Sequence, residues 1–552
     1  MSLNRADFLA GLSVAGLLLP EAVAYSSIAN LQPQHAIFAA VAGLLIYSLL
    51  GRSRFAIVSP TSSSAAILAA AVGAVTLDTG AASAEPLAYG AVILTGLFFL
   101  IAGFARLGFL ANFISRPVLR GFAFGLAITI VVSQLPHMAN VHVPSGDPFH
   151  VLLHLAQVAA NWNWPSILTG AASLAALVLL KRIPAVPAAF LVLVGAILVS
   201  LLVDLKSYGV DLVGHIDAKP DMPSLPHLTL TTWAHLARVA APLFLIVYAE
   251  SWGSMRNLAL RHGDTLDANL ELRALGFANA ASGLVHGMPV GAGFSGSSAN
   301  DTAGAQSRLS GFVAGIAIII FMVFAGDLIA LLPTPVLAAV VISALFHALE
   351  PAPLIRLWKI DRDQYVAVAA ALAVMMLGVL NGMLVAVALS LLAILQRLSQ
   401  PRIDMLGRLG DSHDFVDCAR HPDVIPDPHI LVLRPARQLF FANAEAIMNQ
   451  VAKLAKANST TRAVILSLEE TVDVDSTALD ALAEGEAQLQ RMQRRLYLAR
   501  VKEETRDTFS RAGDLDLISP ARCFWSVADA FDAAAAQVKT DMAAPKTARG
   551  AG

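Results

Sequence analysis

Charged residues are scarce in this chain. They make up 14% of its 552 residues, whereas 56% of the residues are hydrophobic. A soluble globular protein carries about a quarter charged residues, so the composition excludes that class for most of the chain. The mean hydropathy of +0.65 points the same way. The sequence therefore predicts a polytopic α-helical membrane protein.

Cysteine is also scarce, and the charge is nearly balanced. The two cysteines, Cys418 and Cys523, lie in the polar C-terminal part. They imply no disulfide framework and fit a reducing compartment. A net charge of -2 gives no reason to expect a nucleic-acid partner. We expect no signal peptide of the usual kind, because Asp7 precedes the first apolar run and no small-residue cleavage site ends it.

Sequence patterns typical of catalysis are missing. The histidines fall mostly in loops, and no pair has a metal-ligand context. We find no nucleophile–base pair and no Gly-rich phosphate loop. The sequence therefore predicts a protein that is not an enzyme, with no metal site and no cofactor.

Long hydrophobic runs are abundant, and fourteen of them are predicted membrane spans, some shorter than the roughly 20 residues of a full crossing. Seven fall in each half of residues 1–400. An odd number per half places the halves in opposite orientations, as in an inverted repeat. Repeat 1 covers about 1–205 and repeat 2 about 235–397. The predicted spans are 7–24, 33–50, 60–76, 86–105, 118–136, 165–181, 187–204, 236–256, 269–287, 295–304, 308–331, 335–349, 363–380 and 382–397.

The basic residues fix the predicted orientation. With the N-terminus in the cytoplasm, the outer loops 77–85, 137–164 and 205–235 contain only Lys206 and Lys219, and nearly all other basic residues of the apolar region fall inside. This asymmetry satisfies the positive-inside rule. It predicts an integral protein of the cell membrane whose C-terminal domain is cytoplasmic.

Two Ser-rich segments stand at matching places in the two halves, residues 58–64 and 290–298. Hydroxyl side chains are good helix N-caps, and a helix N-terminus carries about half a positive charge and free N–H groups. Two such ends facing each other at mid-membrane form an anion site. The alternative is that small residues merely allow close helix packing. The candidate anion-binding residues are Thr61, Ser62, Ser63, Ser295, Gly296 and Ser297.

Two carboxylates lie inside predicted spans. Glu21 follows Pro20 in the first span, and Glu250 lies near the middle of the eighth. Such residues are costly in a membrane and are functional candidates by default. Burial favours the neutral form of Glu21, which suits it to load and release a proton. Tyr25 is a further candidate for the anion cavity, and pairing with its hydroxyl is the structural alternative for Glu21. Glu250 could bind a cation, hold a proton or anchor the half-helices.

Two sequence blocks resemble the SulP family of anion transporters, also called SLC26. The first holds Asp7–Leu12, Leu19–Tyr25, Leu31–Pro33 and Ile46–Arg54, and the second runs from Gly276 to Asn300. The resemblance implies the UraA-like fold, with a core domain of spans 1–4 and 8–11 and a gate domain of spans 5–7 and 12–14. It also implies a homodimer that transports sulfate, bicarbonate, chloride or dicarboxylates by an elevator-like motion.

Two positions depart from the pattern of many family members. Glu21 stands where many have Gln, and bacterial members with Glu there are similar to proton-coupled symporters, so that role carries over to Glu21. Gly296 stands where many members have Arg. The loss of a fixed positive charge leaves the identity of the anion open.

The polar region 404–540 is predicted to be an α/β domain, followed by a disordered tail at 541–552. Runs at 429–434, 463–468 and 496–499 are typical of strands, and 442–457 of a helix. Another helix begins near Ser476, with Asp475 or Ser476 as its cap. The domain resembles a STAS domain, in which the serine matching Ser476 can be phosphorylated. A capping role for Ser476 is the simpler interpretation.

These observations favour a secondary transporter that couples the uptake of sulfate or a dicarboxylate to protons. One alternative is an uncoupled exchanger or channel, and another is a sodium-coupled bicarbonate transporter, since sodium coupling through Glu250 stays open. A nucleobase permease shares the fold but usually lacks a STAS domain. A membrane-anchored STAS signalling or scaffold protein is the alternative of another class.

Overall fold

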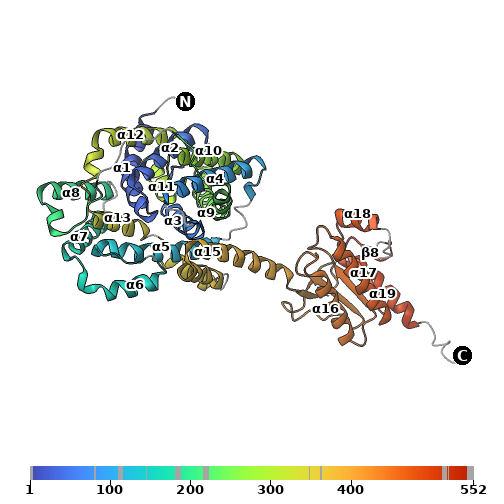
Figure 1. Cartoon of the computed structure of the whole chain (residues 1–552). Helices are drawn as coiled ribbons and strands as arrows, with labels where there is room; N and C mark the ends of the chain where they lie inside the picture. The colour runs from blue at the N-terminus through green and yellow to red at the C-terminus, as the bar shows by residue number, and fades with distance from the viewer. Residues whose placement is uncertain are drawn as a thin grey trace. The chain divides into compact units, whose positions relative to one another are not determined.

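The computed structural model describes residues 4–79, 83–109, 116–144, 146–180, 188–214, 223–346, 348–360, 364–512, 519 and 521–543. The chain forms two compact units, Met1–Leu391 and Leu392–Gly552 (Figure 1). The first is a bundle of apolar helices and the second an α/β domain. Because each unit has its own hydrophobic core, each is described separately.

Every predicted span falls on a helix of the first unit or on α15. By length and composition, six helices among the described residues can cross a membrane, and six shorter apolar helices accompany them. The first repeat supplies α1 (Arg5–Ile28), α2 (Pro33–Leu50), α3 (Ser62–Thr79), α4 (Glu85–Phe104), α5 (Arg116–Ala139), α7 (Trp164–Leu180) and α8 (Ala188–Leu202). The second supplies α9 (Leu230–His262), α10 (Ala268–Leu284), α11 (Phe294–Thr302), α12 (Leu309–Ile329), α13 (Thr334–Leu345) and α15 (Gln364–Ser399).

The last two predicted spans share α15. Gly378 interrupts this helix with a φ of 79° and a ψ of 170°, a conformation that glycine adopts readily and other residues rarely do. The break lies close to the predicted division between residues 380 and 382. The expected pair of spans is therefore present as two helical segments joined at a glycine.

Some predicted loops contain short helices. These are α6 (Pro148–Gln157), η2 (Ala159–Asn161), η3 (Leu205–Tyr208) and α14 (Ala352–Ile360). The side chain of Asp147 caps α6 by accepting from the N–H groups of Phe149 and His150. Val151 and Leu155 then fall on one buried face, one turn apart. The helices are too short to change the predicted count of spans.

The helices of the first unit form two groups that match the core and gate domains implied by the resemblance. In the core group, α10 packs against α4 and α2, α12 packs against α1 and α2, and α9 packs against α3 and α4. In the gate group, α13 packs against α5 and α7. Contact between α4 and α10 is close, because a Cβ atom added to Gly96 would lie 2.5 Å from the backbone N of Ala280. The core group thus packs as one tight body.

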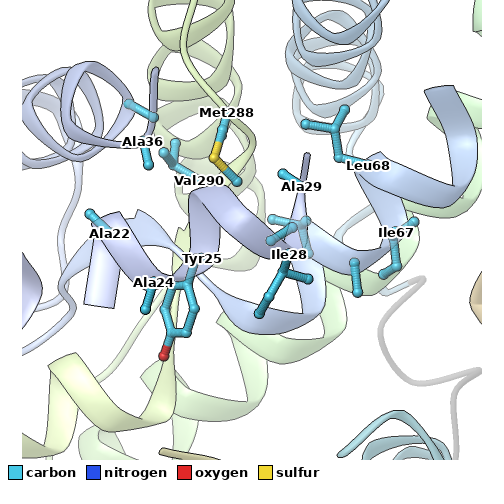
Figure 2. Packing of buried hydrophobic residues seen from close by; sticks show 14 of the residues in the cluster. Ala22, Ala24, Tyr25, Ile28, Ala29, Ala36, Ile67, Leu68, Met288 and Val290 are labelled. Carbon is cyan, nitrogen blue, oxygen red and sulfur yellow. The ribbon is translucent and has the colours of Figure 1, made fainter. Parts of the chain in front are cut away.

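Two three-residue strands join the repeats. β1 (Val58–Pro60) pairs antiparallel with β2 (Val290–Ala292), with Val58 opposite Ala292 and Pro60 opposite Val290. Each strand leads directly into a short or broken span, α3 or α11. Figure 2 shows Val290 and Met288 packed beside α1 and α2 in the buried core. The antiparallel pairing brings the two Ser-rich segments together, as the inverted repeat predicts.

The second unit is built on a six-stranded sheet of order β4-β3-β5-β6-β7-β8. Strands β5 to β8 run parallel, and β3 is antiparallel to both neighbours. The strands are β3 (Ile403–Arg408), β4 (Phe415–Asp417), β5 (Ile430–Pro435), β6 (Ala463–Ser467), β7 (Arg495–Ala499) and β8 (Cys523–Phe524), and the helices are α16 (Ala444–Ala457), α17 (Ser476–Arg491), α18 (Glu503–Ala512) and α19 (Val527–Ala543). Residues of α16, α17 and α18 share one core, and those of α19 pack in another.

The predicted α/β alternation is correct, and the three predicted strands match β5, β6 and β7 with limits displaced by about one residue. The strands β3, β4 and β8 were not predicted, and two further details differ. Asp475, not Ser476, caps α17, since its side chain accepts from the N–H of Ala478, while Ser476 is the first helical residue and is exposed. The predicted disordered tail begins too early, because α19 continues to Ala543. The rest of that tail, 544–552, lies outside the described residues.

Candidate anion site

The N-terminal end of α3 is closed by its own side chains. The Thr61 hydroxyl accepts a hydrogen bond from the Ser64 N–H at 3.1 Å, and the Ser64 hydroxyl accepts one from the Thr61 N–H at 3.1 Å. This reciprocal arrangement is a capping box. The Ser64 hydroxyl also reaches the carbonyl of Pro289 at 3.1 Å, in the loop before β2. The prediction that a hydroxyl begins this helix is confirmed at Thr61.

The N-terminal end of α11 is open. Its cap is Gly293, which makes no side-chain hydrogen bond to the helix, so the hydroxyl cap expected for this segment is wrong. The reason is that the hydroxyls are engaged elsewhere. Ser295 donates to Glu21 at 2.8 Å, and Ser297, which is fully buried, accepts from the N–H of Ile57 at 3.1 Å.

Gly296 and Ser297 therefore lie on the side of α11 that packs against the chain entering β1. A Cβ atom added to Gly296 would lie 3.2 Å from Cγ2 of Ile57. Gly296 can offer an anion its backbone N–H, and the Ser297 hydroxyl accepts the bond from Ile57. The roles of both residues as anion ligands stay predictions, as do those of Ser62 and Ser63, the partly exposed first residues of α3.

The two helix ends lie against each other. A Cβ atom added to Gly293 would be 3.1 Å from Cγ2 of Thr61. In the part of the chain that the structure describes, no hydrogen bond occupies the first free N–H groups of either end. Together the two ends supply about one positive charge. The free donors belong to Ser62, Ser63, Phe294, Ser295 and Gly296.

Two carboxylates are exchanged between the repeats. Glu21, on the first helix of repeat 1, accepts from Ser295 of repeat 2 at 2.8 Å. Glu250, on the first helix of repeat 2, accepts from Thr61 of repeat 1 at 3.2 Å. Each acid thus holds the half-helix of the other repeat. For Glu250 this geometry is that of the predicted anchor. Glu21 accepts from the hydroxyl of Ser295, and its predicted pairing with Tyr25 stays a prediction.

Tyr25 lies near both acids. Its ring is buried, with 6% of the residue exposed, and it is close enough to interact electrostatically with both Glu21 and Glu250. Its hydroxyl points away from Met288 and Val290 (Figure 2). The structure therefore gathers five of the predicted site residues around the two helix ends: Glu21, Tyr25, Thr61, Glu250 and Ser295.

Sequence reasoning missed residues that complete or support this region. Phe294 is the first residue of α11 and is 48% exposed, beside Gly253; an aromatic among Ser and Gly was the available signal. Asp7 is buried and accepts from the N–H groups of Gln306 and Ser307 at 2.7 and 2.9 Å, which ties α1 to the segment after α11. Its place just before an apolar run gave no hint of this partner.

A second buried acid was also missed. Glu271 is fully buried in α10 and accepts from the hydroxyl of Tyr47 at 2.7 Å and from the N–H of Arg52 at 3.1 Å. These bonds hold the connection between α2 and β1 on α10. The acid lies near the start of a span, where the sequence alone suggests an exposed residue.

Comparison with known proteins decides the family. Residues 5–371 match the model of the sulfate permease family. The chain belongs to this family. Residues 421–530 match the STAS domain, in agreement with the α/β domain described above. The family consists of membrane transporters of anions and not of enzymes.

Named relatives cover nearly the whole chain. It is 33% identical over 532 residues to a probable sulfate transporter of Mycobacterium tuberculosis, covering 96% of this chain and 95% of the relative. It is 26% identical over 566 residues to sulfate transporter 1.2 of Arabidopsis thaliana, covering 98% and 86% respectively. Anion transport is thus the activity of this sulfate permease family member.

Two solved structures share the fold. SLC26A9 superposes with a TM-score of 0.87 at 22% identity, over 97% of this chain and 91% of the other. The transmembrane domain of the cyanobacterial bicarbonate transporter BicA gives a TM-score of 0.61 at 20% identity, over 70% and 97%. At these identities the likeness concerns the fold alone, and it confirms the predicted helical membrane domain.

Proposed function

We propose that this protein takes up sulfate together with protons, and that the anion binds between the N-terminal ends of α3 and α11. The observation that carries the proposal is the bond from Ser295 to Glu21. It places a carboxylate one hydrogen bond from the open helix end that supplies most of the free N–H groups. The charge of Glu21 and the charge of a bound anion therefore act on the same few atoms.

This proximity gives a physical basis for coupling. An ionised Glu21 repels an anion at the α11 end, and the repulsion is strong where water is scarce. A protonated Glu21 removes it, so anion and proton bind together. Coupling is also needed energetically, because moving a dianion inward against 100 mV costs about 4.6 kcal/mol at roughly 2.3 kcal/mol per charge.

Sulfate is the proposed substrate for two reasons. The relatives that match nearly the whole chain are named sulfate transporters, and a tetrahedral oxyanion can accept from several backbone N–H groups at once. A dicarboxylate is the second candidate, because Gly296 leaves the site without a fixed arginine charge. Bicarbonate coupled to sodium through Glu250 is the third.

The wider arrangement follows from the same proposal. The core group carries the anion and moves against the gate group in an elevator-like motion, with the protein a homodimer in the cell membrane. The N-terminus and the STAS domain are placed in the cytoplasm on the distribution of basic residues. The STAS domain serves the dimer, trafficking or regulation, and Ser476 is its exposed candidate for modification.

The test is uptake of labelled sulfate into proteoliposomes with an imposed pH gradient, for the natural protein and for Glu21→Gln. We expect an inside-alkaline gradient to drive accumulation by the natural protein. Glu21→Gln keeps a hydrogen-bond acceptor for Ser295 but cannot exchange a proton, so it should bind sulfate and lose the response to the gradient. A response that survives the substitution unchanged would remove Glu21 from the mechanism.

Further conditions in the same uptake assay separate the alternative transport modes and substrates. Uptake that needs sodium and not a pH gradient indicates the sodium-coupled transporter, and uptake that needs only an anion on the other side indicates the exchanger. Competition by succinate, fumarate and bicarbonate ranks the substrates. A lack of flux for every anion, with no effect of Ser62→Ala, would leave the signalling or scaffold protein as the better interpretation.

A further inference from the structure

The outer edge of β2 is completed by a side chain. β2 has one neighbouring strand, β1, so the N–H and C=O groups on its other edge need partners inside the membrane. Asn279, from α10, supplies them at Val290. Its Oδ1 accepts from the Val290 N–H at 2.9 Å, and its Nδ2 donates to the Val290 carbonyl at 2.8 Å. The carboxamide thus pairs with β2 as one residue of a third strand would.

Asn279 has no exposed surface. Its Nδ2 also donates to the Leu275 carbonyl of its own helix at 2.9 Å. This second bond holds the carboxamide in one orientation on α10. Asn279 therefore fixes the position of Val290 along α10, and its side chain cannot change rotamer without losing these bonds.

The next residues lead straight to the anion site. Only Gly291, Ala292 and Gly293 separate Val290 from Phe294, where α11 begins. Ala292 is held in turn by Ser251 of α9, whose hydroxyl accepts from the Ala292 N–H at 2.9 Å. Two side chains, those of Asn279 and Ser251, thus hold the strand that leads into the open end of α11.

The first repeat supports its strand differently. There α2 approaches β1 directly, because Gly43 has no side chain, and a Cβ atom added to it would lie 2.5 Å from the carbonyl of Val58. Backbone contact leaves little freedom of adjustment. In the second repeat a side chain spans the gap, so the position of the helix end depends on the length and polarity of that one residue.

We propose that Asn279 is a positioning residue for anion transport: its carboxamide sets where the open end of α11 presents its N–H groups, and so sets the affinity and size preference of the site. The inference rests on the proposed binding of the anion between the two helix ends. It assigns Asn279 no contact with the anion.

The test measures the KM and maximal rate of sulfate uptake, and its inhibition by selenate and by chloride, for Asn279→Ala, Asn279→Gln and Ser251→Ala. The matched control is Tyr248→Phe, which removes another buried bond of the core, from the Tyr248 hydroxyl to the Gly108 carbonyl at 2.6 Å. Asn279→Gln keeps the amide but lengthens the side chain by one methylene, so it should displace β2 while keeping groups that can bond to Val290.

We expect the Asn279 and Ser251 variants to raise the KM for sulfate by about tenfold and to change the preference between sulfate and selenate. Tyr248→Phe should lower only the melting temperature or the maximal rate. If Asn279→Ala does not fold, Asn279→Gln and Ser251→Ala carry the same expectation. A KM and a preference that match the natural protein in every folded variant would overturn the inference.

Ser295→Ala separates this inference from the function it rests on. If Ser295→Ala raises the KM and the Asn279 variants do not, the anion site stands and the positioning role falls. If the natural protein transports no anion under any gradient, the proposed function itself fails.

Discussion

The two half-helix ends of this protein are related by the inverted repeat but finished in different ways. The end of α3 has a capping box made by Thr61 and Ser64, and the end of α11 has only Gly293. The carboxylates around them keep the symmetry, since Glu21 and Glu250 each hold the end that belongs to the other repeat. The carboxylate bonds between the repeats are symmetric, whereas the capping is not. At α3 the capping box occupies the Ser64 N–H, and at α11 no side chain of the cap residue bonds to the helix.

The difference separates two tasks that a transporter site must perform. A closed end bound to a carboxylate is a fixed support. An open end with free N–H groups is a place for a ligand, and in this protein it lies one hydrogen bond from the acid proposed to carry the proton. Removing the support, or closing the open end, should therefore have different consequences.

The largest effect is expected when the support of α3 is removed. Glu250→Ala leaves the Thr61 hydroxyl without its acceptor, and a buried donor without a partner costs about 1–3 kcal/mol. We expect sulfate uptake to fall by roughly 10- to 100-fold. Glu250→Gln keeps an acceptor oxygen and should retain most of the uptake. Equal uptake by the alanine variant and the natural protein would show that the α3 end needs no anchor.

A smaller effect should follow from closing the α11 end. Gly293→Ser places a hydroxyl at the N-cap, where it can accept from the N–H of Ser295 or Gly296 and so compete with the anion. The control is Gly293→Ala, which makes the same close approach to Thr61 without a hydroxyl. We expect the serine variant to have a KM for sulfate several-fold above that of the alanine variant, by about 1 kcal/mol. Equal KM values for the two variants would mean that free N–H groups at this end do not bind the anion.

The smallest effect on transport is expected from a helix cap outside the membrane unit. Asp475 accepts from the N–H of Ala478 at 2.8 Å and from that of Phe441 at 2.7 Å, whereas Ser476 is exposed. Asp475→Ala should weaken α17 by about 1–2 kcal/mol, seen as faster hydrogen exchange of its first turn in the intact protein. Ser476→Ala should change exchange by less than about 0.5 kcal/mol. The reverse order would return the capping role to Ser476.

The sequence was a good guide where local chemistry decides the structure. Pro60 and the Gly and Ser residues near it predicted interrupted spans, because few other residues tolerate such backbone inside a membrane. The same reasoning failed at Gly293, since hydroxyls that can cap a helix can also bond to a distant acid. Whether Ser295 reaches its own helix or Glu21 depends on packing between residues 274 positions apart.

The sequence alone could not predict residues whose role depends wholly on tertiary contacts. In the sequence Asn279 is one polar residue in an apolar span, and Asp7 is an ordinary residue at the start of the first span. Only the fold brings Asn279 to the edge of β2 and Asp7 to Ser307. The family resemblance supplied the division into core and gate groups, which the hydropathy pattern alone does not contain.

The pairing of β1 with β2 also sets the distance between the two helix ends. Three residue pairs hold the two helix ends at a set separation, and a slip of one residue would shift them by about 3.3 Å, more than the radius of a small ion. Discrimination between cargoes of different size therefore need not come from the side chains that touch them. This discrimination can come from the register of six paired backbone positions, and a point substitution at the ligand-facing surface would leave that register intact.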